Sequence, residues 1–309
     1  MDWIKQNMKN LKIKAAFILL VLILGTTGIL VGQYSGEGRK IIYDKNSVYY
    51  RIVVFDKDNL RYLVFGNNVH QTVMDKSNPD RIVFEYAKTL ISSIYLQNNR
   101  SHALLVGLGG GALVKFFKRY LPNTKTDVSE IDPMVIDVAK KYFQTEFNHN
   151  IKAYAYDGRI FIRRVQKKYD IVMLDAYNSD YIPFHLMTKE FFTEIKNKMT
   201  PNGVVYQNIW TSNKLMVRLL NTLKSLFKYV YVAPGVKTSN AIIYASDAKP
   251  DFSQQSINRA FTEFKKNKLN YEFGFVESLR RYKEHTGRFQ PSLVLTDEHA
   301  PLNYFHGAR

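Results

Sequence analysis

Short apolar runs alternate with amphipathic segments from residue 104 to residue 175. The run 104–106, LLV, suits a buried parallel strand, and the glycine-rich stretch that follows suits a tight turn. We then expect helices at 112–120, 133–142 and 158–166, separated by strands at 126–130, 151–156 and 170–175. This alternation predicts an α/β fold, a doubly wound sheet of parallel strands with helices on both faces.

The same pattern continues toward the C-terminus. Thr188 suits the N-cap of a helix that ends near Met199, and a strand is expected at 204–208. A helix at 213–227 and strands at 229–233 and 241–245 extend the predicted sheet, and helical stretches follow at 256–267 and 272–282. Residues 79–309 therefore read as one Rossmann-like nucleoside-binding domain.

A different pattern precedes the glycine turn. Residues 49–73 contain β-rich runs broken by the turn sequences DKDN and GNN, which predicts a meander of short antiparallel strands. Residues 79–97 have an apolar stripe at helical spacing. Residues 33–46 combine glycine, serine and charges, as a linker does. We therefore expect a linker at 33–46 and a small β-strand domain at 47–78.

An uncharged apolar segment lies near the N-terminus. It runs over residues 15–32, follows a basic tail at 1–14, and approaches the roughly 20 residues that cross a bilayer. A secretory signal peptide is the alternative, but the apolar run is long and no clear cleavage site follows it. We expect a single-pass membrane anchor at 15–32. Lysines and arginines flank both ends, so the side of the membrane stays open.

Composition narrows the chemistry. The chain of 309 residues has no cysteine, which excludes disulfides and thiolate catalysis, and its seven histidines show no metal-ligand spacing, so we expect no metal. The net charge of +17 attracts phosphates, but the basic residues are spread along the chain and no nucleic-acid module is visible. We therefore expect a small-molecule substrate and a membrane as partners, and no nucleic acid.

Polar residues stand where the predicted strands end, the edge at which open α/β sheets bind ligands. Glu130 follows the glycine turn by about twenty residues, the spacing at which a carboxylate can accept both hydroxyls of a ribose. Asp132 is better placed to cap a helix, and capping is the alternative for Asp157 also. The candidate nucleoside-binding residues are Gly107, Gly109, Gly110, Glu130, Asp157 and Gly158, and Asp175 ends a further strand.

The chain resembles the spermidine synthase family of polyamine aminopropyltransferases, and especially its membrane-associated, spermidine-synthase-like branch. The resemblance covers roughly residues 47–208, with a weaker match at 295–302. It rests on the segments SVYYRIVVF, GLGGGAL, SEIDPMVIDVAKKYF, YDGRIFIRR, YDIVMLDAYNSDYIPFHLMTKEFF and TPNGVV. It implies a small β-domain in front of a class I methyltransferase-type domain, decarboxylated S-adenosylmethionine as co-substrate, a polyamine acceptor and a possible homodimer.

The resemblance also implies a role for individual residues. Glu130 is then the ribose ligand, Asp157 the adenine ligand, and Asp175 the acid that receives a proton from the attacking amine. Such an acid makes chemical sense, because an amine is protonated at neutral pH and must lose its proton to attack carbon. Asp180 is a second candidate catalytic acid, which would bind a second amine. The candidate substrate-binding residues are Tyr49, Tyr50, Gln71 and Tyr177.

Two departures from the family pattern keep other functions open. Family synthases carry an aspartate inside the glycine turn, whereas this chain has only glycine and Leu108 there. A phenol also replaces an amide at Tyr50. A methyltransferase that uses S-adenosylmethionine is therefore one alternative to an aminopropyl-transferring enzyme. A catalytically inactive, membrane-anchored nucleoside-binding protein is the other.

Overall fold

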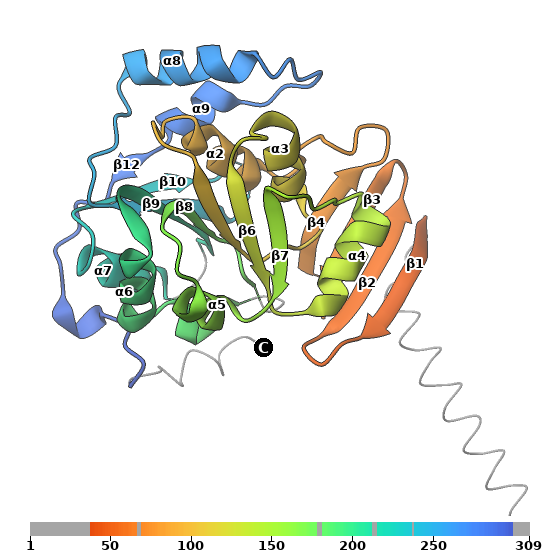
Figure 1. The fold of residues 1–309 in the computed structure, drawn as a ribbon, viewed down its shortest axis with the longest axis horizontal. Coiled ribbons are helices and arrows are strands. Elements are labelled where there is room, and N and C mark those ends of the chain that lie inside the picture. The colour runs from red at the N-terminus through yellow and green to blue at the C-terminus, as the bar shows by residue number, and fades with distance from the viewer. Residues whose placement is uncertain (1–37, 67–68, 178–180, 212–214, 237, 299–309) are drawn as a thin grey trace, which may run out of the picture.

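The computed structural model describes residues 38–66, 69–177, 181–211, 215–236 and 238–298. In that part of the chain a small sheet stands beside a large sheet that helices cover on both faces (Figure 1). The predicted anchor at 15–32 lies outside the described residues. Among the helices that are described, none is long and apolar enough to cross a membrane.

The small sheet is an antiparallel meander of four strands. They are β1 (Arg39–Asn46), β2 (Arg51–Lys57), β3 (Leu60–Phe65) and β4 (Val69–Asp75), paired in that order. The predicted linker was wrong over residues 39–46, because these residues pair with β2 as the edge strand β1. The apolar face of the sheet packs on α4 (Pro133–Phe143), where Ile52 and Leu63 meet Val135 and Phe143.

The large sheet has eight strands in the order β12-β10-β11-β9-β8-β5-β6-β7. Five strands run parallel, and β11, β10 and β12 complete the sheet in antiparallel pairs. The order of the chain reverses between β5 and β8, which is the switch point where such sheets bind ligands. The bounds are β5 (His102–Val106), β6 (Lys125–Glu130), β7 (Ile151–Ala155), β8 (Tyr169–Leu174), β9 (Met199–Trp210), β10 (Tyr229–Pro234), β11 (Asn240–Ser246) and β12 (Lys283–Glu284).

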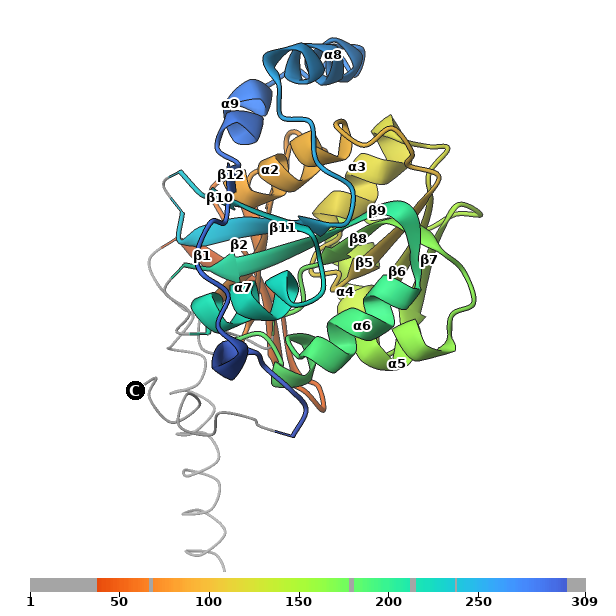
Figure 2. The ribbon, with the colours of Figure 1, turned by 90° about the vertical axis from the view of Figure 1, so that its left-hand side faces the viewer.

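Helices cover both faces, as Figure 2 shows. One face carries α2 (Glu85–Ile94), α3 (Ala112–Tyr120), α8 (Gln254–Lys265) and α9 (Phe275–Arg280), which share one apolar core. The opposite face carries α5 (Gly158–Arg164), α6 (Lys189–Asn197) and α7 (Met216–Lys224), which share another. Short 3-10 turns lie at Phe184–Leu186 and Pro291–Leu293. The predicted α/β architecture with a small N-terminal sheet is confirmed.

Local signals explain several element boundaries. Asp132 caps α4 by accepting the amide of Met134 at 2.9 Å, and Thr188 caps α6, both as predicted. The helix expected from residue 79 was too long, because α2 begins only at Glu85. Residues 79–80 form a turn and residues 81–84 have no regular secondary structure, and the amide of Ile82 donates to the Tyr271 hydroxyl at 3.1 Å.

Candidate active site

Two adjoining cavities open at the carboxyl ends of the central strands. The first lies under the glycine turn, and its walls include Glu130 and Asp157. The second extends toward β9 and β11, and its walls include Asn208 and Trp210. The wall residues that both cavities share are Gln71, Phe84, Tyr86, Asp175 and Tyr177. Asp175 therefore lies where a molecule in one cavity would meet a molecule in the other.

The glycine turn connects β5 to α3 and leaves no room for side chains. At Gly107, which has φ +97°, a Cβ would lie 2.3 Å from the backbone oxygen of Asp175. At Gly110 a Cβ would lie 2.7 Å from Thr72 Cγ2 and 2.9 Å from the ring of Phe143. Thr72 also accepts the Gly110 amide at 2.7 Å, so the small sheet holds the turn in place. The predicted tight turn is confirmed, and the approach of its backbone to a ligand stays a prediction.

Glu130 ends β6 directly beside the turn and is only 5% exposed. Its two carboxylate oxygens accept the backbone amides of Leu108 and Asp132, each at 3.0 Å. Burial raises the pKa of Glu130 to about 7, and the backbone hydrogen bonds oppose that rise. The carboxylate is fixed at the cavity wall by amides that bind its charged form.

Asp157 follows β7 and has two roles at once. Its Oδ1 caps α5 by accepting the amides of Arg159 at 2.9 Å and Ile160 at 3.0 Å. Its Oδ2 lies 2.9 Å from His185 Nε2. Burial alone would raise the pKa of Asp157, but the hydrogen bonds from His185 and the α5 amides hold it below its usual value. Asp157 therefore caps α5, as one of the two interpretations expected, and also lies on the cavity wall, while its binding of a nucleoside stays a prediction.

Asp175 follows β8, and two side chains hold its carboxylate. Tyr86 Oη donates to Oδ2 at 3.0 Å, and Asn208 Nδ2 donates to Oδ1 at 2.7 Å. Asn240 in turn donates to Asn208 Oδ1 at 3.0 Å, which orients the Asn208 amide. Burial raises the pKa of Asp175 to about 6, and the bonds from Asn208 and Tyr86 oppose that rise. A carboxylate with a pKa of about 6 is ionised at neutral pH and can accept a proton.

Known proteins that are similar to this chain show which family it belongs to. A model of the spermine/spermidine synthase domain matches residues 84–253. The polyamine aminopropyltransferase of Vibrio vulnificus is 32% identical over 219 residues, which are 69% of this chain and 73% of that protein. The chain belongs to the spermine/spermidine synthase family. The recognition made from sequence motifs is thereby confirmed at the level of the family.

Solved structures agree with this fold. A spermidine synthase in complex with the transition-state analogue AdoDATO has a TM-score of 0.59 at 20% identity, and the match covers 76% of this chain and 79% of that one. Human methyltransferase-like protein 13 in complex with SAH has a TM-score of 0.55 at 23% identity, with 61% of this chain and 95% of that one covered. Both likenesses show that the Rossmann-like, methyltransferase-type fold is shared.

The sequence-predicted substrate residues of this family member lie around the first cavity. Tyr50 stacks on Phe65 with ring centroids 4.1 Å apart, and Tyr49, Tyr50 and Gln71 line the same cavity as the glycine turn. Burial and the nearby charge of Glu130 raise the pKa of the Tyr50 phenol, which therefore stays neutral. Asp180, the second candidate catalytic acid, lies outside the described residues.

Four side chains of the site were not predicted from the sequence. Tyr86, Asn208 and Trp210 line the second cavity, and Thr72 fixes the turn. Trp210 stacks on Tyr177 with ring centroids 5.5 Å apart. Asn208 ends the segment predicted as a strand, so listing polar strand-end residues of every type, rather than acids alone, would have found it. The described residues contain no group of three or more potential metal ligands.

Proposed function

We propose that this transferase moves an aminopropyl group from decarboxylated S-adenosylmethionine to an amine or polyamine. The observation that carries the proposal is the position of Asp175 on the wall common to both cavities. We call the first cavity the donor half and the second the acceptor half. Membership of the spermine/spermidine synthase family supports this assignment, as do the relatives named polyamine aminopropyltransferases.

The donor half suits a nucleoside. Glu130 would accept the ribose hydroxyls, because its carboxylate is fixed at the end of β6 beside the glycine turn. Asp157 Oδ2 would accept the adenine amino group, since Oδ1 is already used to cap α5. Gly107 and Gly109 lie on the wall of the same cavity, where their backbone would contact the sugar.

The acceptor half suits an amine. Asp175 would orient the amine and accept its proton, while the amine nitrogen bonds to the aminopropyl carbon and the bond from that carbon to sulfur breaks. The sulfonium leaves as neutral methylthioadenosine, so the donor needs no further activation and positioning is the main task. Tyr86 and Asn208 hold both carboxylate oxygens and so fix the base. The stacked rings of Tyr177 and Trp210 would pack on the acceptor.

Methyl transfer is the second candidate function, and the glycine turn favours it. No carboxylate projects from Gly110, and a Cβ there would meet Thr72 and Phe143, so the donor's ammonium group lacks the partner that the family pattern supplies. The likeness to a methyltransferase fold agrees with this candidate.

The mass of the product separates the two reactions. The full-length chain, purified in mild detergent, is incubated with a panel of amines and either decarboxylated or intact S-adenosylmethionine. We expect aminopropylated product from the decarboxylated donor and its absence in the Asp175→Asn variant. Methylated product from the intact donor alone would establish the second candidate instead. Nucleoside binding without transfer to any amine would leave a non-catalytic binding protein.

We further propose that residues 15–32 anchor the chain in a membrane and that it forms a homodimer. Alkaline carbonate extraction of membranes tests the first, with recovery in the membrane pellet as the expected result and full release contradicting it. Light scattering of the detergent-purified chain tests the second, where a monomer mass would contradict the dimer.

A further inference from the structure

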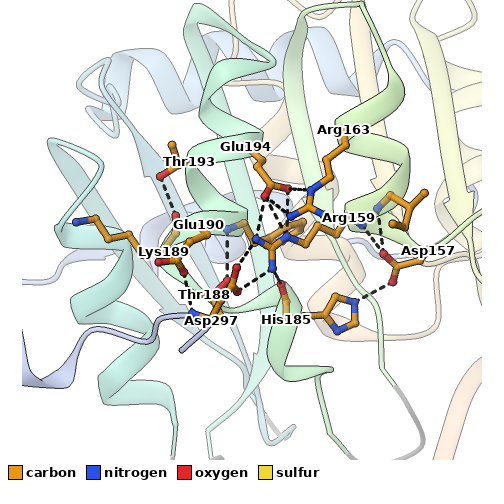
Figure 3. Close-up of polar contacts among 12 residues, drawn as sticks. Asp157, Arg159, Arg163, His185, Thr188, Lys189, Glu190, Thr193, Glu194 and Asp297 are labelled. Atoms are coloured by element: carbon orange, nitrogen blue, oxygen red, sulfur yellow. Dashed lines mark hydrogen bonds and ion pairs between the residues drawn. The ribbon is translucent and has the colours of Figure 1, made fainter. Parts of the chain in front are cut away.

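A buried arginine lies behind the donor half. The side chain of Arg159 is only 8% exposed, yet its guanidinium is paired with two carboxylates. Glu194 on α6 accepts at 2.9 Å, and Asp297 in the C-terminal segment accepts with both oxygens at 2.8 and 2.7 Å. Figure 3 shows the guanidinium between these two acids. The Asp297 side chain is itself 40% exposed, so the two parallel hydrogen bonds, rather than burial of both partners, define the geometry of this pair.

Arg159 also connects to the residues that face the nucleoside. Its backbone amide donates to Asp157 Oδ1 at 2.9 Å, and its Nη1 donates to the backbone oxygen of His185 at 3.4 Å. The His185 ring returns to Asp157 Oδ2 at 2.9 Å, and this contact is visible in Figure 3. Asp157, Arg159 and His185 thus form a closed ring of contacts. Asp297 is not part of this ring of contacts, but it binds the guanidinium of Arg159.

The segment that carries Asp297 is itself fixed. Leu295 is fully buried, its carbonyl accepts the amide of Lys189 at 2.8 Å, and its amide donates to Thr222 Oγ1 at 2.9 Å. The amide of Asp297 donates to Glu190 Oε2 at 3.0 Å. The Asp297 carboxylate is therefore held against α6, 138 residues along the chain from Arg159.

We propose that Asp297 is a positioning residue of the donor half, which acts through Arg159 to hold His185 against Asp157. This role rests on the proposed nucleoside donor. With its Oδ1 used by α5, Asp157 has one oxygen left for the base, and His185 fixes where that oxygen points. An ionised carboxylate only accepts hydrogen bonds, so the fixed oxygen selects a 6-amino purine over a 6-oxo purine.

Arg163 supplies a matched control. Its guanidinium donates to the same Glu194 at 2.9 and 3.1 Å, but its side chain is 54% exposed, and these two hydrogen bonds do not involve His185. Arg163→Gln therefore removes an ion pair from the same cluster without touching the ring of contacts. If Asp297 had only a structural role, Asp297→Asn would have the same nucleoside affinity and base preference as Arg163→Gln.

Calorimetry with the full-length chain tests the proposal. The probes are methylthioadenosine and its 6-oxo analogue, methylthioinosine, and the proteins are wild type, Asp297→Asn, Asp297→Glu, His185→Ala and Arg163→Gln. We expect Asp297→Asn to weaken methylthioadenosine binding about tenfold and to reduce the preference for the amino base, because a small displacement of a recognition group is costly. Asp297→Glu retains the charge but displaces the guanidinium, so we expect a smaller loss of the same preference.

The outcomes separate this inference from the proposed function. Wild type that binds no nucleoside overturns both. Wild type that binds, together with Asp297→Asn that retains affinity and base preference, overturns the inference alone. If Asp297→Asn does not fold, Asp297→Glu decides by the same base preference. A combined Asp297→Asn and His185→Ala variant with no greater loss than His185→Ala supports action through His185, and fully additive losses contradict it.

Discussion

The donor half and the acceptor half of the cavity are held by different kinds of hydrogen bond. In the donor half, backbone amides bind both oxygens of Glu130 at the end of β6 and one oxygen of Asp157 after β7, and only the second Asp157 oxygen meets a side chain, that of His185. In the acceptor half, side chains from α2 and β9 bind Asp175. Backbone amides fix a group for recognition, whereas side-chain donors can be replaced one at a time to adjust a pKa. We therefore expect substitutions in the donor half to change nucleoside binding and substitutions in the acceptor half to change the pKa and reactivity of Asp175, each without affecting the other.

The largest effect on binding is expected at Glu130. Glu130→Gln removes the charge that the ribose hydroxyls meet and turns an amide N–H toward the amide of Leu108 or Asp132. We expect the dissociation constant for methylthioadenosine to rise about 30-fold, since hydrogen bonds to charged groups contribute roughly 1.5–3 kcal/mol. Asp137→Asn, an exposed change on α4, is the control. Calorimetry checks the result, and unchanged affinity would show that the donor half does not bind the nucleoside.

A smaller effect is expected on stability at Asp175. Burial raises the pKa of Asp175 in the folded protein from the usual 3.8 to about 6, so the ionised carboxylate destabilises the fold at higher pH. A shift of roughly two pKa units corresponds to about 3 kcal/mol, and the asparagine loses part of the hydrogen bonding from Asn208 and Tyr86, so Asp175→Asn should stabilise the protein by about 1–2 kcal/mol at pH 8. The gain should fade as pH falls from about 6 to about 4 and be absent below that range. Denaturant melts at both ends of this range test it, and a loss of stability at pH 8 would contradict it.

The smallest effect is expected in the pH dependence of kcat/KM. Asp175 must be ionised to accept a proton, so kcat/KM should fall as pH drops through about 6. The Tyr86 hydroxyl stabilises the ionised form, so Tyr86→Phe should raise the pKa and move the acidic limb to higher pH by about half a unit. Tyr282→Phe, which removes a hydroxyl that Ser93 contacts in the core, is the control. A limb that stays in place would mean that Tyr86 does not govern the titration of the base.

The residues that line the donor half could be predicted from the sequence because the signals for them lie close together along the chain. The turn, the acid at the end of β6 and the cap at Asp157 are each read within one strand-turn-helix unit. The bounds of α3 were predicted without error at residues 112–120. A short-range pattern suffices wherever a group is fixed by the backbone of its own segment.

Asp175 was predicted, but the side chains that hold its carboxylate were not, because their contacts with it are distant in sequence. Tyr86 lies 89 residues from Asp175, and at the level of sequence it reads only as part of the apolar stripe of a helix. The strand β1 was not predicted for a related reason. Its sequence RKIIYDKN contains four charged residues, and it becomes a strand because it pairs with β2. Tertiary pairing outweighs local composition in both places.

A single-turnover experiment on Asp175→Asn tests the central claim most directly. Wild type and variant are first saturated with decarboxylated S-adenosylmethionine, with calorimetry confirming equal donor binding, and an amine is then added while methylthioadenosine release is followed. The account predicts equal donor affinity and a rate of release that falls by about a thousandfold, the range of general-base catalysis. Equal rates in the two proteins would contradict the assignment of Asp175 as the proton acceptor between the two halves.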